Sequence, residues 1–214
     1  MTDSAESKTT PLAVIANVAR IVTRVTDRLA GDRSDCPLLV AAGAAEALKN
    51  FGVGANIFYG PAAWIEVMDN HSVRWAGCWG ESVHFWAATE YGEIVDLNAS
   101  VAHRKRVHSD PTARALYSPP MLWSREVPRF FRFRPEGHAE LELHDDRDKR
   151  IWENALREIT EKCQPAQLRP EGEEEFPNEP ILCPGRRLLD DSAGTFKHFD
   201  RAVAVAGIPP APPI

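Results

Sequence analysis

Two amphipathic patterns with a helical repeat open the chain. Between Pro11 and Ala30, apolar residues recur at steps of three and four, which predicts an amphipathic helix ending at Gly31. After a polar break at residues 32–35, the segment Pro37 to Asn50 is richer in alanine and apolar on most sides. A helix of that kind is usually buried, so we expect this second helix to lie in the core.

Beyond Asn50 the hydrophobic period changes to two, which is typical of half-buried β-strands. Turn residues such as Gly60-Pro61, Asp69-Asn70 and Tyr91-Gly92 separate the alternating segments. Strands are expected at 56–59, 63–68, 73–78, 83–89 and 93–97. An antiparallel sheet packed on the buried helix would close the core, giving an α+β fold.

The second half of the chain has weaker signals. They predict a charged connection over 101–120, a hairpin over 129–143 that turns at Pro135-Glu136-Gly137, and a surface helix over 148–162. Residues 164–184 are rich in proline and glutamate, which predicts an extended or mobile segment. We therefore expect a single α+β domain over 1–162, with its core at about 11–145. A Pro/Glu-rich C-terminal extension, 163–214, would pack on this domain or trail it.

Composition limits the classes of partner. With 214 residues, 43% of them hydrophobic, the chain can build one substantial core. A formal charge of -6 provides no overall electrostatic footprint for nucleic acid or an anionic membrane. No apolar run is long enough to cross a bilayer, and residues 1–10 lack a signal-peptide pattern. We expect a cytoplasmic protein whose partner is a small-molecule, peptide or acyl substrate.

The four cysteines lie far apart, without a C-x-x-C pair. This spacing indicates neither a zinc site nor a disulfide framework, so we expect thiols, no metal and no cofactor. His103 and His108 flank a basic run without a third ligand at useful spacing, which favours a solvated loop over a metal site.

Cys36 is the candidate nucleophile. It directly precedes Pro37, and proline is favoured at the first helical position. The thiol is therefore expected at a helix N-terminus, where unpaired amides and the helix dipole favour the thiolate and lower its pKa. The alternative is a buried cysteine that packs as a small hydrophobe.

A hairpin supplies the candidate partners of Cys36. If residues 90–92 form a three-residue loop, with Gly92 in the left-handed conformation, Thr89 pairs with Glu93. Counting outward, the opposed pairs are then Trp86 with Asp96 and His84 with Asn98. Opposed residues share a face, so His84 and Asp96 would meet diagonally, with Asn98 on the same face. A two-residue loop would send His84 and Asp96 to opposite faces.

Cysteine, histidine and aspartate are the minimal apparatus for acyl transfer through a thioester. The sulfur attacks, the imidazole moves protons near neutral pH, and the carboxylate orients the ring. Taken singly, His84 is also compatible with an ordinary strand histidine, and Asp96 with a carboxylate bonded to backbone amides.

Short motifs carry a family resemblance over roughly residues 35–98. They are Cys36-Pro37-Leu38-Leu39, a helix end at 48–55, His84-Phe85-Trp86, and the strand 92–97 with Asp96. Together they resemble the transglutaminase-like cysteine peptidases, and the order Cys, His, Asp is also that of the arylamine N-acetyltransferases. The resemblance implies a papain-like/transglutaminase-like core in which the nucleophile starts a buried helix packed on an antiparallel sheet.

The sequence departs from these families beside the nucleophile. Pro37 stands where transglutaminases often have tryptophan, and no glutamine lies a few residues upstream to bind the oxyanion. The oxyanion donors would be the Cys36 N–H and an indole of Trp64, Trp75 or Trp79. Trp86, Asn98 and these three tryptophans are possible supporting residues, although core packing also explains the tryptophans.

Three hypotheses follow. The first is a cysteine hydrolase or acyltransferase, of peptidase or amidase type, that acts through a thioester on Cys36. The second is a catalytically degenerate binding or scaffolding module in which Cys36 is structural. The third is a redox thiol protein, which needs a resolving cysteine such as Cys78 near the first thiol.

Overall fold

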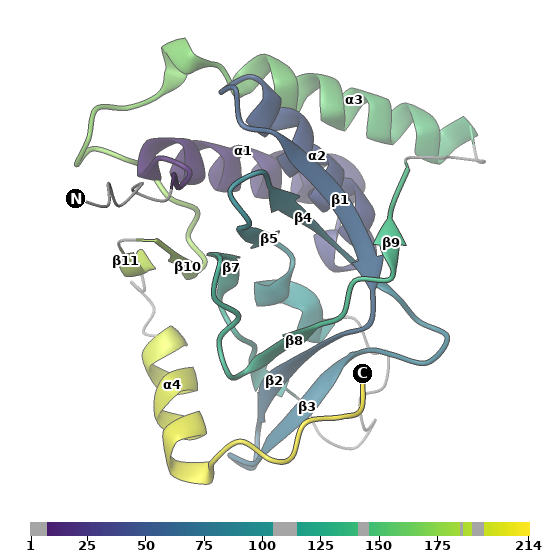
Figure 1. Ribbon diagram of the computed structural model, residues 1–214, viewed down its shortest axis with the longest axis vertical. Coiled ribbons are helices and arrows are strands. Elements are labelled where there is room, and N and C mark those ends of the chain that lie inside the picture. Colours follow the sequence, from purple (N-terminus) through teal and green to yellow (C-terminus); the bar gives the residue numbers. More distant parts are fainter. Residues whose placement is uncertain (1–7, 105–114, 141–145, 185, 190–194) are drawn as a thin grey trace, which may run out of the picture.

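The structure is a computed structural model that describes residues 8–104, 115–140, 146–184, 186–189 and 195–214. Its architecture is α+β: three helices cover a seven-stranded sheet, and a four-stranded sheet lies beside the first (Figure 1). Within the described ranges, no helix is both long enough and apolar enough to cross a membrane.

The helical layer consists of α1 (Leu12–Ala30), α2 (Pro37–Lys49) and α3 (Asp146–Lys162). The predicted helices match these bounds to within two residues. α2 lies between the other two helices and strands of the large sheet, and most of its side chains are buried, as its composition predicts. A Cβ on Gly43 of α2 would lie 2.8 Å from Ile159 Cδ1 of α3, so glycine permits the close approach of these helices.

The large sheet carries the predicted histidine hairpin. Its strand order is β11-β10-β7-β5-β4-β1-β9. The bounds are β1 (Ala55–Gly60), β4 (His84–Thr89), β5 (Ile94–Asp96), β7 (Met121–Ser124), β9 (Gly137–His138), β10 (Ile181–Cys183) and β11 (Arg186–Leu189). The pairing is antiparallel throughout, except that β10 runs parallel to β7.

The small sheet corrects two predictions. It contains β2 (Ala62–Met68), β3 (Val73–Cys78), β6 (Ala115–Tyr117) and β8 (Phe131–Phe133). The single predicted sheet is therefore wrong: the chain leaves β1 at Gly60 and enters the second sheet after Pro61, which lacks an N–H to continue a ladder. The predicted hairpin over 129–143 is also wrong, because β8 pairs with β2 whereas β9 pairs with β1.

The described residues of 163–214 pack on both sheets. After the 3₁₀ turn η3 (Pro165–Gln167), β10 lies between β11 and β7 in the large sheet. Helix α4 (Thr195–Ala206), which the sequence patterns left unassigned, buries Phe199 and Val203 against Ile65 and Val67 of the small sheet. Beyond it, Pro209 accepts a hydrogen bond from the Trp75 indole at 2.9 Å.

Candidate functional site

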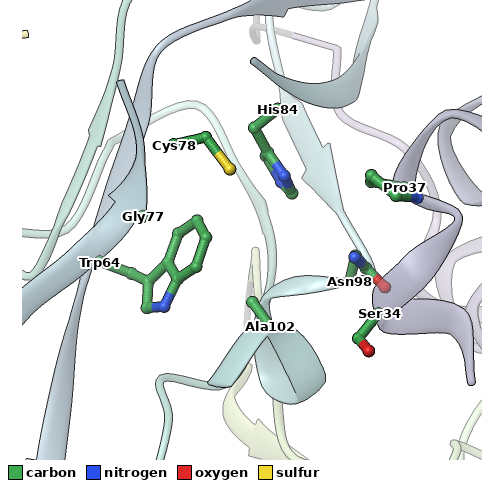
Figure 2. Close-up of a pocket in the computed structure, with 8 residues that line it drawn as sticks. All are labelled: Ser34, Pro37, Trp64, Gly77, Cys78, His84, Asn98 and Ala102. Atoms are coloured by element: carbon green, nitrogen blue, oxygen red, sulfur yellow. The ribbon is translucent and has the colours of Figure 1, made fainter. Parts of the chain in front are cut away.

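A pocket lies where the two sheets meet the start of α2, and we call it the His84 pocket (Figure 2). Its walls come from α2, β2, β3, β4 and two short 3₁₀ helices, η1 (Arg33–Asp35) and η2 (Ala99–Arg104). It is lined by Ser34, Pro37, Trp64, Gly77, Cys78, His84, Asn98 and Ala102.

The register of the β4–β5 hairpin is the one that the sequence predicts. Ala87 pairs with Val95 and Ala88 with Ile94, and the Thr89 N–H donates to the Glu93 carbonyl at 2.9 Å. Gly92 closes the three-residue loop with a φ of 77°, a conformation in which a Cβ is strained. His84 and Asp96 therefore project from the same face.

The His84 imidazole and the Asp96 carboxylate form a buried pair. His84 Nε2 and Asp96 Oδ2 are 2.9 Å apart, and each residue is only 2% exposed. Asp96 Oδ1 accepts a second hydrogen bond from the Asn98 N–H at 3.0 Å. Because the carboxylate is an acceptor, it favours the proton on Nε2, which leaves Nδ1 of the neutral ring as the basic nitrogen.

Two tryptophan rings lie next to the imidazole. The ring centroid of Trp64 lies 5.5 Å from that of His84, and the Trp86 ring stacks at 6.4 Å. The Trp64 indole donates to Glu66 Oε1 at 3.4 Å. Burial raises the pKa of the Glu66 carboxyl, opposed by the hydrogen bond from Trp64 and by the Arg74 charge. Both tryptophans are nearly fully buried, so they exclude water from the imidazole.

Cys36 occupies its predicted place, at the N-cap of α2 with Pro37 in the first helical position. Its thiol, however, contacts the carbonyl oxygens of Arg33 and Asp32 at 3.7 and 3.9 Å. Burial raises its pKa to about 12, the carboxylates of Asp35, Asp27 and Asp32 add to the effect, and the Arg33 charge opposes it. The expected lowering of the pKa is therefore wrong for this side-chain position, since burial and these carboxylates outweigh the helix dipole.

The structure thus assembles part of the predicted constellation. His84, Asp96 and Asn98 lie together, whereas Cys36 is absent from the described residues that line the His84 pocket. Both near neighbours of Cys36, Ser34 and Pro37, line it. The backbone of Cys36 accordingly passes the pocket while its thiol points into η1.

The expected oxyanion donors are engaged elsewhere. The Cys36 N–H donates to the Arg33 carbonyl at 3.1 Å, and the Trp75 indole donates to Pro209. The Trp64 indole is directed at Glu66. Trp79, half-buried directly after β3, is not among the described residues lining the pocket.

Cys78 lines the pocket, and sequence reasoning considered it only as a resolving thiol. In Figure 2 its sulfur is directed toward the space beside the His84 ring. Ala62 pairs with Cys78, so Cys78 shares a sheet face with Trp64, two residues further along β2. The sequence could have predicted this position from loop length. Residues 69–71 form a second three-residue loop, with the Met68 N–H donating to the Ser72 carbonyl.

Arg33 is a further residue that sequence reasoning missed. Its side chain is fully buried and pairs with Asp27 Oδ2 at 2.5 Å and with Glu179 Oε1 at 2.8 Å. It also donates to Ser100 Oγ at 3.2 Å. Arg33 thereby ties η1, which precedes Cys36, to α1, to η2 and to the segment before β10. The sequence analysis placed it only within the polar break at residues 32–35.

Within the described ranges, no three or more His, Cys, Asp or Glu side chains form a group able to hold a metal ion. His103 Nδ1 lies 2.8 Å from Ser118 Oγ, and His108 falls outside the described residues. All four cysteines are buried thiols.

Comparison with known proteins identifies no family. No protein-family model and no curated protein matches the chain. One solved structure, named "The crystal structure of genomics APC5867", aligns with 78% of this chain and 83% of its own, at 14% identity and a TM-score of 0.39.

Proposed function

We propose that the protein is a cysteine-dependent hydrolase or acyltransferase with a papain-like/transglutaminase-like core. Cys36 is the nucleophile, His84 the general base, and Asp96 the residue that orients the imidazole. The observation that carries this proposal is the buried pair of His84 Nε2 and Asp96 Oδ2, in a pocket beside the N-terminus of α2. Such a pair leaves Nδ1 poised to accept a proton.

The proposed chemistry requires the Cys36 side chain to turn about χ1 toward the His84 pocket. The sulfur contacts that it gives up, at 3.7 and 3.9 Å, are long and weak. In the pocket the thiol proton passes to His84 Nδ1, and the thiolate attacks an acyl carbon. The leaving group departs with that proton, and water or another acceptor then cleaves the thioester.

The binding or scaffolding alternative is supported by the state of Cys36 in the structure. A thiol whose pKa is about 12 is protonated at neutral pH and is a poor nucleophile. If Cys36 never leaves η1, the pair of His84 and Asp96 is a structural hydrogen bond.

Alkylation distinguishes the two functions. Iodoacetamide labelling of each cysteine is followed by mass spectrometry from pH 5 to 11, in the parent protein, His84→Ala and Cys78→Ser. The enzyme proposal expects fast labelling of Cys36 near neutral pH, lost in His84→Ala and retained in Cys78→Ser. Labelling of Cys36 that rises only toward pH 11 and ignores His84 would overturn the proposal. Fast labelling of Cys78 instead would move the nucleophile to β3.

A further inference from the structure

Asn98 is a buried residue that a backbone hydrogen bond holds beside Asp96. Its N–H binds Asp96 Oδ1, and the residue is 2% exposed. The carboxamide lines the His84 pocket, and among the described residues its Oδ1 has no hydrogen-bond partner. Among the described residues nothing donates to this oxygen, so that atom does not tie the carboxamide to the rest of the fold, and the amide nitrogen of the same group can donate to a bound molecule.

The orientation of the carboxamide suits that role. In Figure 2 its nitrogen lies on the side of His84 and its oxygen on the side of Ser34. Asn98 follows the end of β5 by two residues, and the bond from its N–H to Asp96 Oδ1 holds it beside the pair of His84 and Asp96. A base and a hydrogen-bond donor thus face the same small space.

We propose that the side-chain amide of Asn98 stabilises the oxyanion formed during acyl transfer. This inference rests on the proposed function of Cys36 and His84. The Cys36 N–H and the indoles of Trp64 and Trp75 already donate within the protein. Asn98 Nδ2 is therefore the donor that binds the oxyanion in their place.

The Cys36 thiol gives its proton to His84 Nδ1, and the sulfur forms a bond to the acyl carbon. The carbonyl π pair moves to oxygen, which accepts a hydrogen bond from Asn98 Nδ2. When the oxyanion collapses, the C=O bond re-forms and the bond to the leaving group breaks. The donor thus acts on a charge that exists only at and near the transition state.

Two probes of one thiol isolate this effect. p-Nitrophenyl acetate acylates Cys36 through a tetrahedral oxyanion and releases p-nitrophenolate, whereas iodoacetamide alkylates the sulfur by displacement at carbon without one. The variant is Asn98→Ala, which keeps the N–H that binds Asp96. The matched control is Asn17→Ala, since Asn17 on α1 is also buried, with an unpartnered Oδ1, and does not line the His84 pocket.

We expect Asn98→Ala to slow acylation by about 10²- to 10³-fold while alkylation of Cys36 and the melting temperature stay close to the parent values. Asn17→Ala should change neither rate. Equal losses with both probes, or no loss with the ester, would overturn the role of Asn98 alone. If parent Cys36 reacts with neither probe in a His84-dependent way, the proposed function itself fails, and the role of Asn98 fails with it.

Discussion

The β4–β5 hairpin and the junction of η1 with α2 supply the two halves of the candidate site. The hairpin already holds its side chains in the geometry that the proposed chemistry needs, whereas the junction does not. In the hairpin, His84 Nε2 and Asp96 Oδ2 are already 2.9 Å apart, both residues are buried, and two tryptophan rings lie next to the imidazole. At the junction, Cys36 has the right backbone position but its thiol packs on the carbonyls of η1 and is protonated.

The difference shows that strand pairing constrains the position of a side chain more than a helix cap does. A hairpin register fixes which face each residue occupies, so two polar side chains on one face meet diagonally. A helix N-cap fixes only the backbone, and the rotamer of the side chain depends on the groups around it. For Cys36 those neighbours are backbone oxygens and carboxylates.

The largest expected effect comes from a substitution in the hairpin half of the site, at Asp96. Asp96→Asn keeps the shape of the side chain but can donate to His84 Nε2, which moves the proton to Nδ1 and removes the base. We expect acylation of Cys36 by p-nitrophenyl acetate to fall by roughly three to four orders of magnitude. Asp69→Asn, in the exposed turn after β2, is the control. A variant that keeps more than a tenth of the parent rate would remove Asp96 from the mechanism.

The second-largest expected effect concerns the buried carboxylate of Glu93, which holds the hairpin to its neighbours. Glu93 is fully buried and accepts hydrogen bonds from the N–H and hydroxyl of Thr10, the Thr89 hydroxyl and the Trp123 indole. Glu93→Gln removes the charge and places an amide donor among these donors. We expect a loss of about 2–3 kcal/mol in the free energy of unfolding, measured with urea.

Glu90→Gln provides the comparison for Glu93. Glu90 lies in the loop that precedes Glu93 but is exposed, and its Oε1 accepts a hydrogen bond from the Gly54 N–H at 2.8 Å. We expect a change below about 0.5 kcal/mol there. Equal losses in both variants would mean that burial of Glu93 does not stabilise the hairpin.

Gly92→Ala probes the loop that sets the register. No described atom lies within 4 Å of the added Cβ, so the cost is the backbone strain at a φ of 77°, about 1 kcal/mol. Gly52→Ala, at the end of α2, carries the same strain at a φ of 71° with equally open space. We expect similar drops in melting temperature, with slower acylation of Cys36 only in Gly92→Ala. Slower acylation in both would show that general destabilisation is the cause.

The smallest expected effect comes from a substitution in the junction half of the site, at Asp35. Asp35 is exposed, and its carboxylate contributes to the raised pKa of the Cys36 thiol. Asp35→Asn should lower that pKa, which raises the thiolate fraction at every pH below it. Iodoacetamide labelling of Cys36 at pH 9 should accelerate by about twofold to threefold, and 1 M salt should abolish the difference. Unchanged labelling would show that the Asp35 charge does not contribute to the pKa of the Cys36 thiol.

The sequence by itself determined the local geometry of the site. Loop length and the period of two fix the pairing of Ala87 with Val95, and Pro37 fixes the start of α2, because both rules act between residues close in the chain. The same rule applied to residues 69–71 predicts that Cys78 and Trp64 share a face.

Only the tertiary structure decided the rest, because it depends on segments distant in sequence. The short strand β10 joins the large sheet through its parallel pairing with β7, and Glu179 reaches back to the buried Arg33. The thiol of Cys36 is protonated because folding buries it and brings Asp27 of α1 near Asp32 and Asp35. Desolvation and the sum of several charges are properties of the packed chain, and no spacing of residue types encodes them.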